Sequence, residues 1–571
     1  MKQKLLMLAL AALTLSPSIA HSEHPKPNVL FIAIDDLNDW IGCLGGHPQT
    51  ITPNFDRLAK SGQLYSNAHC SAASCNPSRS SLMLGVSPHT SGIYSNGQKM
   101  REVLPDTTLM PKHFSNNGYW SGGSGKLLHY FIDANSWDAY FPKKETENPF
   151  PRTLYPETRP LSLPRAGAWQ YKETDWGGLD ATDQEFGGDF LVSNWISKHL
   201  KKQHDKPFFL ACGIYRPHEP WFVPQKYFDK FPLESIKLPL GYKKNDLDDL
   251  PPSGKKMGPN RYFKHILAHK QWKQGIQGYL ASINFADAML GRVLDALESG
   301  PNKDNTIVVL WSDHGWHLGE KQHWQKYTGW RASTRVPLMI RVPKGCSTAL
   351  PHGTKAGTVY KHPVSLLSLY NTLNELCGLP AHGTDSISLV PTLKSQAQQF
   401  ESALTFLDHR GSVAVSGTDW RYIRYQNGDH ELYHIPTDPH EWNNLASSPQ
   451  HAKHIKRLAA TIPTKLAEYV PPSHDALPAL EWVAHSDSSK LPKPAFDGPN
   501  YQLVFMNKTH ASRKVYSLEK DGSLKFQTTI KAGQKHTLRA ESGSYWIIMS
   551  MQKKQLGYFK ILDRNAKAVI K

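Results

Sequence analysis

The sequence predicts an α/β fold, in which a mainly parallel sheet carries helices on both of its faces. Three continuous apolar runs, at residues 29–34, 208–213 and 306–311, have the composition of strands that are buried on both faces. Helical patterns lie between them, at 54–61, before Lys201 and from about 264 to 297. Strands that alternate with helices in this way are typical of a parallel sheet covered on both sides.

Polar residues follow each of the three predicted strands. Asp35 and Asp36 close the first strand, the segment 216–219 follows the second, and Asp313 and His314 close the third. In open α/β sheets, ligands bind outside the carboxyl ends of the strands. We therefore expect a functional site at this edge of the sheet.

The N-terminus has the pattern of a secretory signal peptide. Lys2 and Lys4 precede an apolar run at 5–15, and small residues follow at 18–20. This run is too short to span a bilayer, and no later run is long and apolar enough to do so. The pattern predicts a signal peptide at residues 1–20, a periplasmic or secreted protein and no membrane span.

The composition indicates a large globular protein with an anionic partner. The 571 residues are 39% hydrophobic and carry a formal net charge of +17. A basic exported protein suits polyanions such as sulfated or uronate-bearing polysaccharides. No recognition helix or RNA-binding signature is present, so nucleic acid is not an expected partner. Six cysteines in this length do not form a disulfide framework, although Cys346 and Cys377 remain a possible pair.

The pattern of elements divides the chain into a catalytic α/β domain at 21–395 and smaller units after it. A hairpin at 420–434 and a helix at about 454–469 indicate an antiparallel subdomain at 396–475. Residues 476–499 are rich in Pro, Ser and Asp and are predicted to form a linker. Short β runs then indicate a small β-sandwich at 500–571.

The acidic strand ends favour a metal site. Adjacent carboxylates repel each other, and a divalent cation relieves that repulsion. Asp35, Asp36, Asp313 and His314, brought together from neighbouring strands, would form a mainly oxygen-lined site of the kind that hard cations prefer. Asp35 and Asp36 alone would be read as a turn or helix-capping pair, and the imidazole of His314 leaves zinc and manganese open.

The most specific motif is Cys-Asn-Pro-Ser-Arg at residues 75–79, followed by Ser-Ser-Leu-Met-Leu-Gly. The cysteine lies at the start of a short helix whose first turn is fixed by proline. This motif resembles the signature of the type I sulfatases, whose cysteine is oxidised to Cα-formylglycine (3-oxoalanine). The resemblance covers residues 27–470 and is strongest to iduronate-2-sulfatase-like members. It also includes the segments 125–129, 216–218, 313–320, 324–326 and 334–338.

The resemblance implies an alkaline-phosphatase-like fold and a set of site residues. It implies a calcium ion held by Asp35, Asp36, Asp313, His314 and the modified Cys75. It implies that Lys126 and Lys326 bind the sulfate and that Arg79 supports the formylglycine hydrate. It also implies that His218 is the general acid and that His129 is a base or orienting group. A formylglycine-generating maturation enzyme is then a required partner.

The sequence thus predicts a calcium-dependent sulfatase that acts on a sulfated, uronate-containing polysaccharide or its oligosaccharides. One alternative is a phosphomonoesterase or phosphodiesterase of the same superfamily, which the Cys-Asn-Pro-Ser-Arg context disfavours. Another is a catalytically silent glycan-binding protein whose Cys75 is never oxidised.

Overall fold

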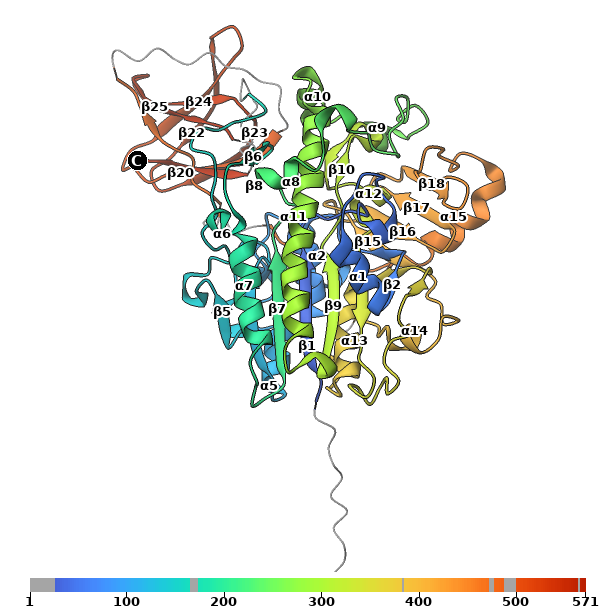
Figure 1. The fold of residues 1–571 in the computed structure, drawn as a ribbon. Coiled ribbons are helices and arrows are strands. Elements are labelled where there is room, and N and C mark those ends of the chain that lie inside the picture. The colour runs from blue at the N-terminus through green and yellow to red at the C-terminus, as the bar shows by residue number, and fades with distance from the viewer. Residues whose placement is uncertain (1–25, 165–172, 383–384, 472–476, 487–499, 563–564) are drawn as a thin grey trace, which may run out of the picture.

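A mixed eight-stranded sheet forms the centre of the protein (Figure 1). The computed structural model describes residues 26–164, 173–382, 385–471, 477–486, 500–562 and 565–571, so the predicted signal peptide lies outside the described residues. From edge to edge the strands are β13 (Thr358–Tyr360), β2 (Gln63–Tyr65), β12 (Leu338–Arg341), β9 (Thr306–Ser312), β1 (Asn28–Ile34), β7 (Phe208–Ile214), β4 (Trp120–Gly125) and β5 (Ala139–Phe141).

The three strands predicted from apolar runs are confirmed, and they are neighbours. β1 pairs in parallel with β7 on one side and with β9 on the other, and β7 pairs in parallel with β4. β12 runs antiparallel to both β9 and β2. Since β9, β1, β7 and β4 are parallel, their carboxyl ends meet at one edge of the sheet.

Helices cover both faces of this sheet, because the side chains of β1 alternate between two separate cores. Leu30, Ile32 and Ile34 belong to one core, and Val29 and Phe31 belong to the other. The first core is closed by α1 (Pro53–Ser61), α7 (Asp189–Leu200) and α11 (Trp272–Glu298), the second by α2 (Cys75–Leu84), α5 (Met110–Asn116) and α13 (Leu369–Leu376). Figure 1 shows α7 and α11 side by side across the sheet.

Two helix predictions were wrong in extent. The pattern at 264–297 forms two helices, α10 (Arg261–Ala268) and α11, separated at Lys270, whose φ of 56° ends the first helix. The pattern at 454–469 forms only α15 (Ala452–Ala459). Pro463 follows closely, and a proline restricts the preceding residue to extended conformations.

No helix of the described residues has the length and apolar character that crossing a membrane requires.

The antiparallel subdomain helps to position the start of α2. Its sheet consists of β15 (Ala403–Phe406), β16 (Val413–Ser416), β17 (Trp420–Arg424) and β18 (His430–His434), and the predicted hairpin is its last pair. The N–H of Phe406 donates to the carbonyl of Ser71 at 2.9 Å, and the N–H of Ala73 donates to the carbonyl of Phe406 at 3.3 Å. The segment that leads into Cys75 is thereby tied to this sheet.

The C-terminal residues form two small packed sheets, as expected for a β-sandwich. A five-stranded sheet contains β19 (Val483–Ala484), β25 (Gln555–Lys560), β24 (Tyr545–Met549), β21 (Arg513–Leu518) and β22 (Leu524–Ile530). A three-stranded sheet contains β23 (Lys535–Glu541), β20 (Asn500–Asn507) and β26 (Ala566–Ile570). β19 lies within the predicted linker and pairs with β25, while most of that linker is outside the described residues. The domain boundaries themselves stay predictions.

Candidate active site

The predicted site residues converge where the parallel strands end. Asp35 and Asp36 follow β1, Asp313 and His314 follow β9, Lys126 follows β4, and His218 lies four residues after β7. Cys75 is the first residue of α2, all ten residues of which are buried. The sheet thus brings together residues that are far apart in the sequence, because parallel strands share one carboxyl edge.

The sulfur of Cys75, present here as the unmodified thiol, lies at the centre of this group. Its Sγ is 3.1 Å from His314 Nε2, 3.1 Å from Lys326 Nζ and 3.8 Å from Lys126 Nζ. Burial alone would raise the pKa of this thiol, but the two lysines and His314 lower it well below its ordinary value. All six cysteines of the chain are free, so Cys75 is not part of a disulfide.

Arg79 ties the acidic strand ends to α2. Its Nη2 donates to Asp35 Oδ1 at 2.8 Å, its Nε donates to Asp313 Oδ2 at 2.8 Å, and its Nη1 donates to the carbonyl of Lys126 at 2.7 Å. One residue earlier, the Ser78 hydroxyl donates to the Asp313 carbonyl at 2.6 Å. Arg79 is therefore a buried clamp across β1, β9 and β4, and it fixes where the helix presents Cys75.

Asp36 has a strained backbone, with a φ of 57°. For a residue other than glycine this left-handed conformation is costly and persists only where the surroundings enforce it. Its N–H donates to Asp313 Oδ1 at 3.1 Å, and its carbonyl accepts a hydrogen bond of 2.8 Å from the Tyr279 hydroxyl. These contacts turn the Asp36 carboxylate towards Cys75, whose Sγ is 3.9 Å from Asp36 Oδ1.

Two buried lysines balance the charge of the first two aspartates. Lys126 Nζ is 2.6 Å from Asp35 Oδ2, and Lys326 Nζ is 2.8 Å from Asp36 Oδ1. Burial disfavours both ammonium groups, but the aspartates and the Cys75 sulfur raise both lysine pKa values above normal. The two lysines are therefore held as permanent cations next to the sulfur.

The two histidines that were predicted to be catalytic favour different protonation states. His218 Nδ1 donates to the Glu219 carbonyl at 2.5 Å, so its Nε2 faces Asp36 Oδ2, 3.6 Å away. Burial would lower the pKa of His218, but Asp36 raises it above the ordinary value. His129 hydrogen-bonds the Cys75 sulfur, and burial lowers the pKa of its imidazole. One imidazole thus favours the protonated form, and the other favours the neutral form.

The acidic residues fit a divalent cation. One ligand atom each of Asp36, Cys75, Asp313 and His314 lies within 4.8 Å of all the others, and Asp35 meets the same criterion with Asp36 and His218. Asp36 Oδ2 is buried and accepts no hydrogen bond from any described residue. An orphaned carboxylate oxygen among three buried aspartates is the donor set that hard cations bind.

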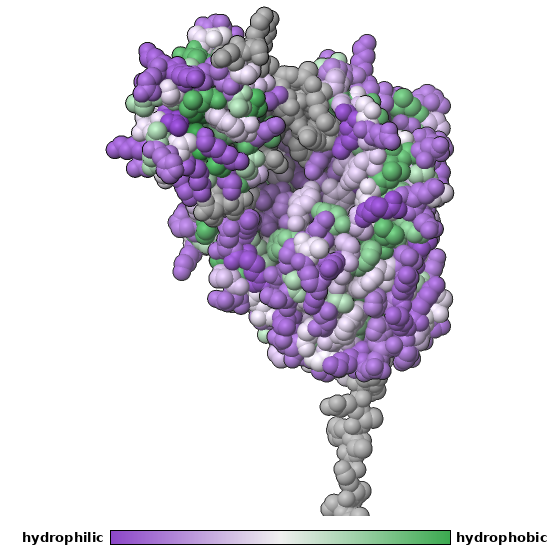
Figure 2. Space-filling model, turned by 90° about the vertical axis from the view of Figure 1, so that its left-hand side faces the viewer, coloured by the Kyte–Doolittle hydropathy of each residue, from purple (hydrophilic) through white to green (hydrophobic). Residues whose placement is uncertain are grey.

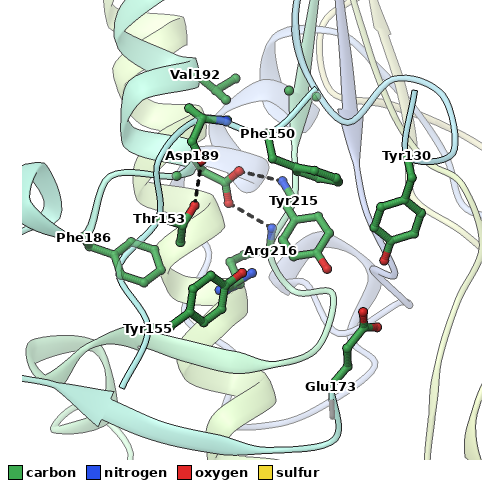
Figure 3. A pocket seen from close by; sticks show the side chains of 14 residues that line it. Tyr130, Phe150, Thr153, Tyr155, Glu173, Phe186, Asp189, Val192, Tyr215 and Arg216 are labelled. Carbon is green, nitrogen blue, oxygen red and sulfur yellow. Dashed lines mark hydrogen bonds between the residues drawn. The ribbon is translucent and has the colours of Figure 1, made fainter. Parts of the chain in front are cut away.

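A cavity of about 250 Å³ adjoins the centre (Figure 3). Two of the tyrosines that line the cavity also contact His218 of the centre. The ring of Tyr215 stacks on the His218 ring with 4.7 Å between centroids, and the Tyr130 hydroxyl is 3.5 Å from His218 Nε2. Figure 3 shows the side chains of Tyr155, Tyr215 and Arg216 gathered around this space. Arg216 Nε donates to the carbonyl of Phe222 at 3.2 Å, whereas its buried Nη2 has no hydrogen-bond partner among the described residues.

Sequence reasoning missed the aromatic residues that surround these charges. Lys126 Nζ lies over the rings of Tyr130 and Tyr215, at 4.7 and 5.4 Å from their centroids. Tyr279, whose hydroxyl donates to the carbonyl of Asp36, lies in the first third of α11. These are 3 of 23 tyrosines in the chain, and none belongs to a charged motif. The adjacency of Tyr130 to His129, and of Tyr215 to the 216–218 segment, was the one available signal.

Comparisons with known proteins identify the relatives of this chain. The sulfatase family model matches residues 27–379. A sulfatase of Formosa agariphila is 40% identical over 77% of this chain and 87% of its own length, and mouse iduronate 2-sulfatase is 30% identical over 73% and 80%. A protein solved in complex with D-glucosamine-2-N,6-O-disulfate superimposes with a TM-score of 0.59 at 20% identity, over 76% of this chain and 96% of its own. This likeness in fold confirms the alkaline-phosphatase-like architecture.

Removing a bound divalent cation is expected to destabilise the protein. Treatment with EGTA should lower the free energy of unfolding by about 2.7 kcal/mol if calcium was previously at a hundred times its Kd. Added calcium should restore the difference, as measured by urea titration, and metal analysis should give one ion per chain. Asp36→Asn should abolish the response, whereas Asp304→Asn, at an exposed position, should keep it. Equal responses in both variants would contradict this location for the ion.

Proposed function

Because the chain belongs to the type I sulfatase family, and is thus a sulfuric ester hydrolase, we propose that it desulfates a uronate-containing polysaccharide or its oligosaccharides. In this proposal Cys75 is converted to formylglycine by a maturation enzyme. The predicted signal peptide, at residues 1–20, supports a periplasmic or secreted location.

The surroundings of the Cys75 sulfur carry this proposal. Lys326 and Lys126 lie within 3.8 Å of it, and the Asp36 carboxylate is next to it. The formylglycine hydrate supplies a nucleophilic oxygen at this point. A sulfate monoester is a stable anion, so the approach of an oxygen nucleophile needs nearby positive charge. Two buried, permanently charged lysines supply that charge where solvent screens it least.

Proton transfers are assigned to the two histidines. His218 has a raised pKa and a fixed tautomer with Nε2 directed into the centre, which suits a general acid that protonates the departing sugar oxygen. His129 is held neutral by burial and contacts Cys75, which suits the acceptance of a proton from the group at position 75. Arg79 is assigned a supporting role through Asp35 and Asp313, which it clamps.

Calcium is the proposed ion, held by Asp35, Asp36, Asp313, His314 and the modified Cys75. When bound, it would withdraw electron density from the sulfuryl oxygens. Three carboxylates and a single imidazole favour a hard ion over zinc. His314 Nδ1 donates to the carbonyl of Gly315 at 3.0 Å, which leaves Nε2 as its ligand atom.

The aromatic cavity supports a uronate as the sugar next to the scissile ester. Sugar rings pack their apolar faces against aromatic side chains, and Tyr155 and Tyr215 supply such faces. The unpartnered Nη2 of Arg216 gives the cavity a buried cationic donor suited to a carboxylate. The mouse relative is named for iduronate, a uronate sugar.

Cys75→Ala is expected to abolish turnover of sulfated oligosaccharides while leaving the fold intact, because only the nucleophile is removed. Cys70→Ala, which alters another buried thiol, should retain activity. Mass spectrometry of the tryptic peptide containing residue 75 should reveal an aldehyde in the active wild-type protein. An unmodified thiol in a fully active preparation would contradict the proposed nucleophile.

His218→Asn should slow hydrolysis most for substrates whose leaving oxygen must be protonated. The kcat for a sugar sulfate should fall by about 10²–10⁴, whereas an aryl sulfate, whose phenolate leaves unaided, should lose far less. In the wild-type enzyme, the rate on sugar sulfate should decline at high pH, as His218 loses its proton above its raised pKa. Equal losses on both substrates would remove His218 from the role of acid.

Arg216→Lys should reduce cleavage of sulfated uronates much more than cleavage of sulfated neutral sugars. The variant keeps a positive charge at this position but loses the planar donor, so kcat/KM for a sulfated uronate should fall about tenfold to a hundredfold. The same sulfate position on a neutral sugar should be cleaved with little change. If both substrates decline together, Arg216 serves the fold rather than the recognition of a carboxylate.

A further inference from the structure

The basic charge of the protein is concentrated in its last domain. Residues 500–571 contain 14 Lys and Arg against 4 Asp and Glu, a net formal charge of +10 out of +17 for the whole chain. This domain lies outside residues 27–379, which the sulfatase family model matches. It contributes no residue to the active centre described above, so its charge calls for another explanation.

A row of apolar residues with three aromatic rings crosses the outer face of the five-stranded sheet. Ladder pairs place neighbouring residues on the same face of a sheet. Successive pairs join Phe526, Tyr516, Ile547, Tyr558 and Val483 into one row across all five strands. The opposite face of these strands is the core of the sandwich, which contains Val515, Ile548 and Phe559. The row therefore lies on the face opposite the core. Phe526, at one end, is 52% exposed, Tyr516 and Tyr558 are half-buried, and Ile547 between them is buried.

Lysines border this row on both sides. In the adjacent row on the same face, Lys514 pairs with Met549. The exposed Lys553 and Lys554 lie in the turn that follows β24. On the other side, Lys560 pairs with Tyr545, and its Nζ lies 5.7 Å from the centroid of that ring. None of the described residues in these three rows is acidic. In Figure 2, hydrophobic side chains gather on the exposed face of this domain and hydrophilic ones surround them.

The other sheet of the sandwich makes a contact with the catalytic domain. Arg261 Nη2, on α10, donates to the hydroxyl of Tyr501, on β20, at 3.2 Å. This contact lies on the three-stranded sheet and not on the outer face of the five-stranded sheet.

We propose that this outer face is a second, non-catalytic binding site for a sulfated polysaccharide. Sugar rings would pack on Tyr516, Phe526 and Tyr558, while the flanking lysines contact the sulfate groups. Three rings spread over a row that crosses five strands suit an extended chain of several sugars better than a single sugar. The choice of a sulfated glycan over other polyanions rests on the proposed function.

The test measures binding separately from turnover. Full-length Cys75→Ala protein is titrated with heparin, used as the probe sulfated polysaccharide, by isothermal calorimetry at fixed salt. On this background, Tyr516→Ala with Phe526→Ala should weaken binding about tenfold, as expected for truncation of the principal contact residues. Lys514→Gln with Lys553→Gln and Lys554→Gln should weaken it to a similar degree. Circular dichroism should show unchanged folding.

A matched charge control uses lysines elsewhere on the same domain. Lys508→Gln with Lys531→Gln and Lys535→Gln removes the same charge from exposed positions at the other sheet and its adjoining turn, and should change affinity less than twofold. Equal losses from both lysine sets, no effect of the aromatic pair, or tighter binding of single-stranded DNA than of heparin would overturn the proposal. In protein with an intact Cys75, the face variants should cleave a small sulfated sugar normally. Binding without any turnover would contradict the proposed function alone.

Discussion

Three aspartates with no solvent exposure at one sheet edge set the main constraint on this structure. Asp35, Asp36 and Asp313 are fully buried, and a buried carboxylate is costly unless a positive group pairs with it. Arg79 pairs with two of them at once, which requires α2 to begin where it does. The position of Cys75 at the start of that helix is therefore a consequence of charge pairing at the strand ends.

The same pairing prepares the centre for an anion. The three carboxylates are matched by the permanent charges of Arg79, Lys126 and Lys326, so the centre is close to neutral before a metal binds. A bound dication would then leave it with excess positive charge in a region that excludes water. Electrostatic attraction is strongest under these conditions, because little solvent reorganises when the anion enters. The aspartates thus hold the cations in place without cancelling their effect on the substrate.

The charged part of the site could be predicted from the sequence because it follows apolar strands directly. Asp35 and Asp313 stand at the ends of runs whose burial was evident from composition. The tyrosines could not be found in this way, since Tyr279 reaches Asp36 from within a helix whose pattern indicates only a buried face. The helix ends were also missed, because the break at Lys270 depends on a backbone conformation that the amphipathic pattern does not report. The sequence therefore predicted which groups meet at the shared edge of the parallel strands, but not which side chains reach that edge from the helices.

The two proposed glycan contacts have different consequences for a polymer and for a single sugar. Once the outer face of the C-terminal sheet holds a polysaccharide, other sulfates of that chain are presented to the active centre at an effective concentration set by the geometry between the sites, about millimolar for short flexible connections. A monosaccharide cannot occupy both sites and gains nothing from the second. A weak site on the C-terminal domain would therefore favour long chains over fragments without changing any residue near Cys75. Separating attachment from chemistry also lets the catalytic cavity remain small, since it needs to recognise only the sugar next to the ester.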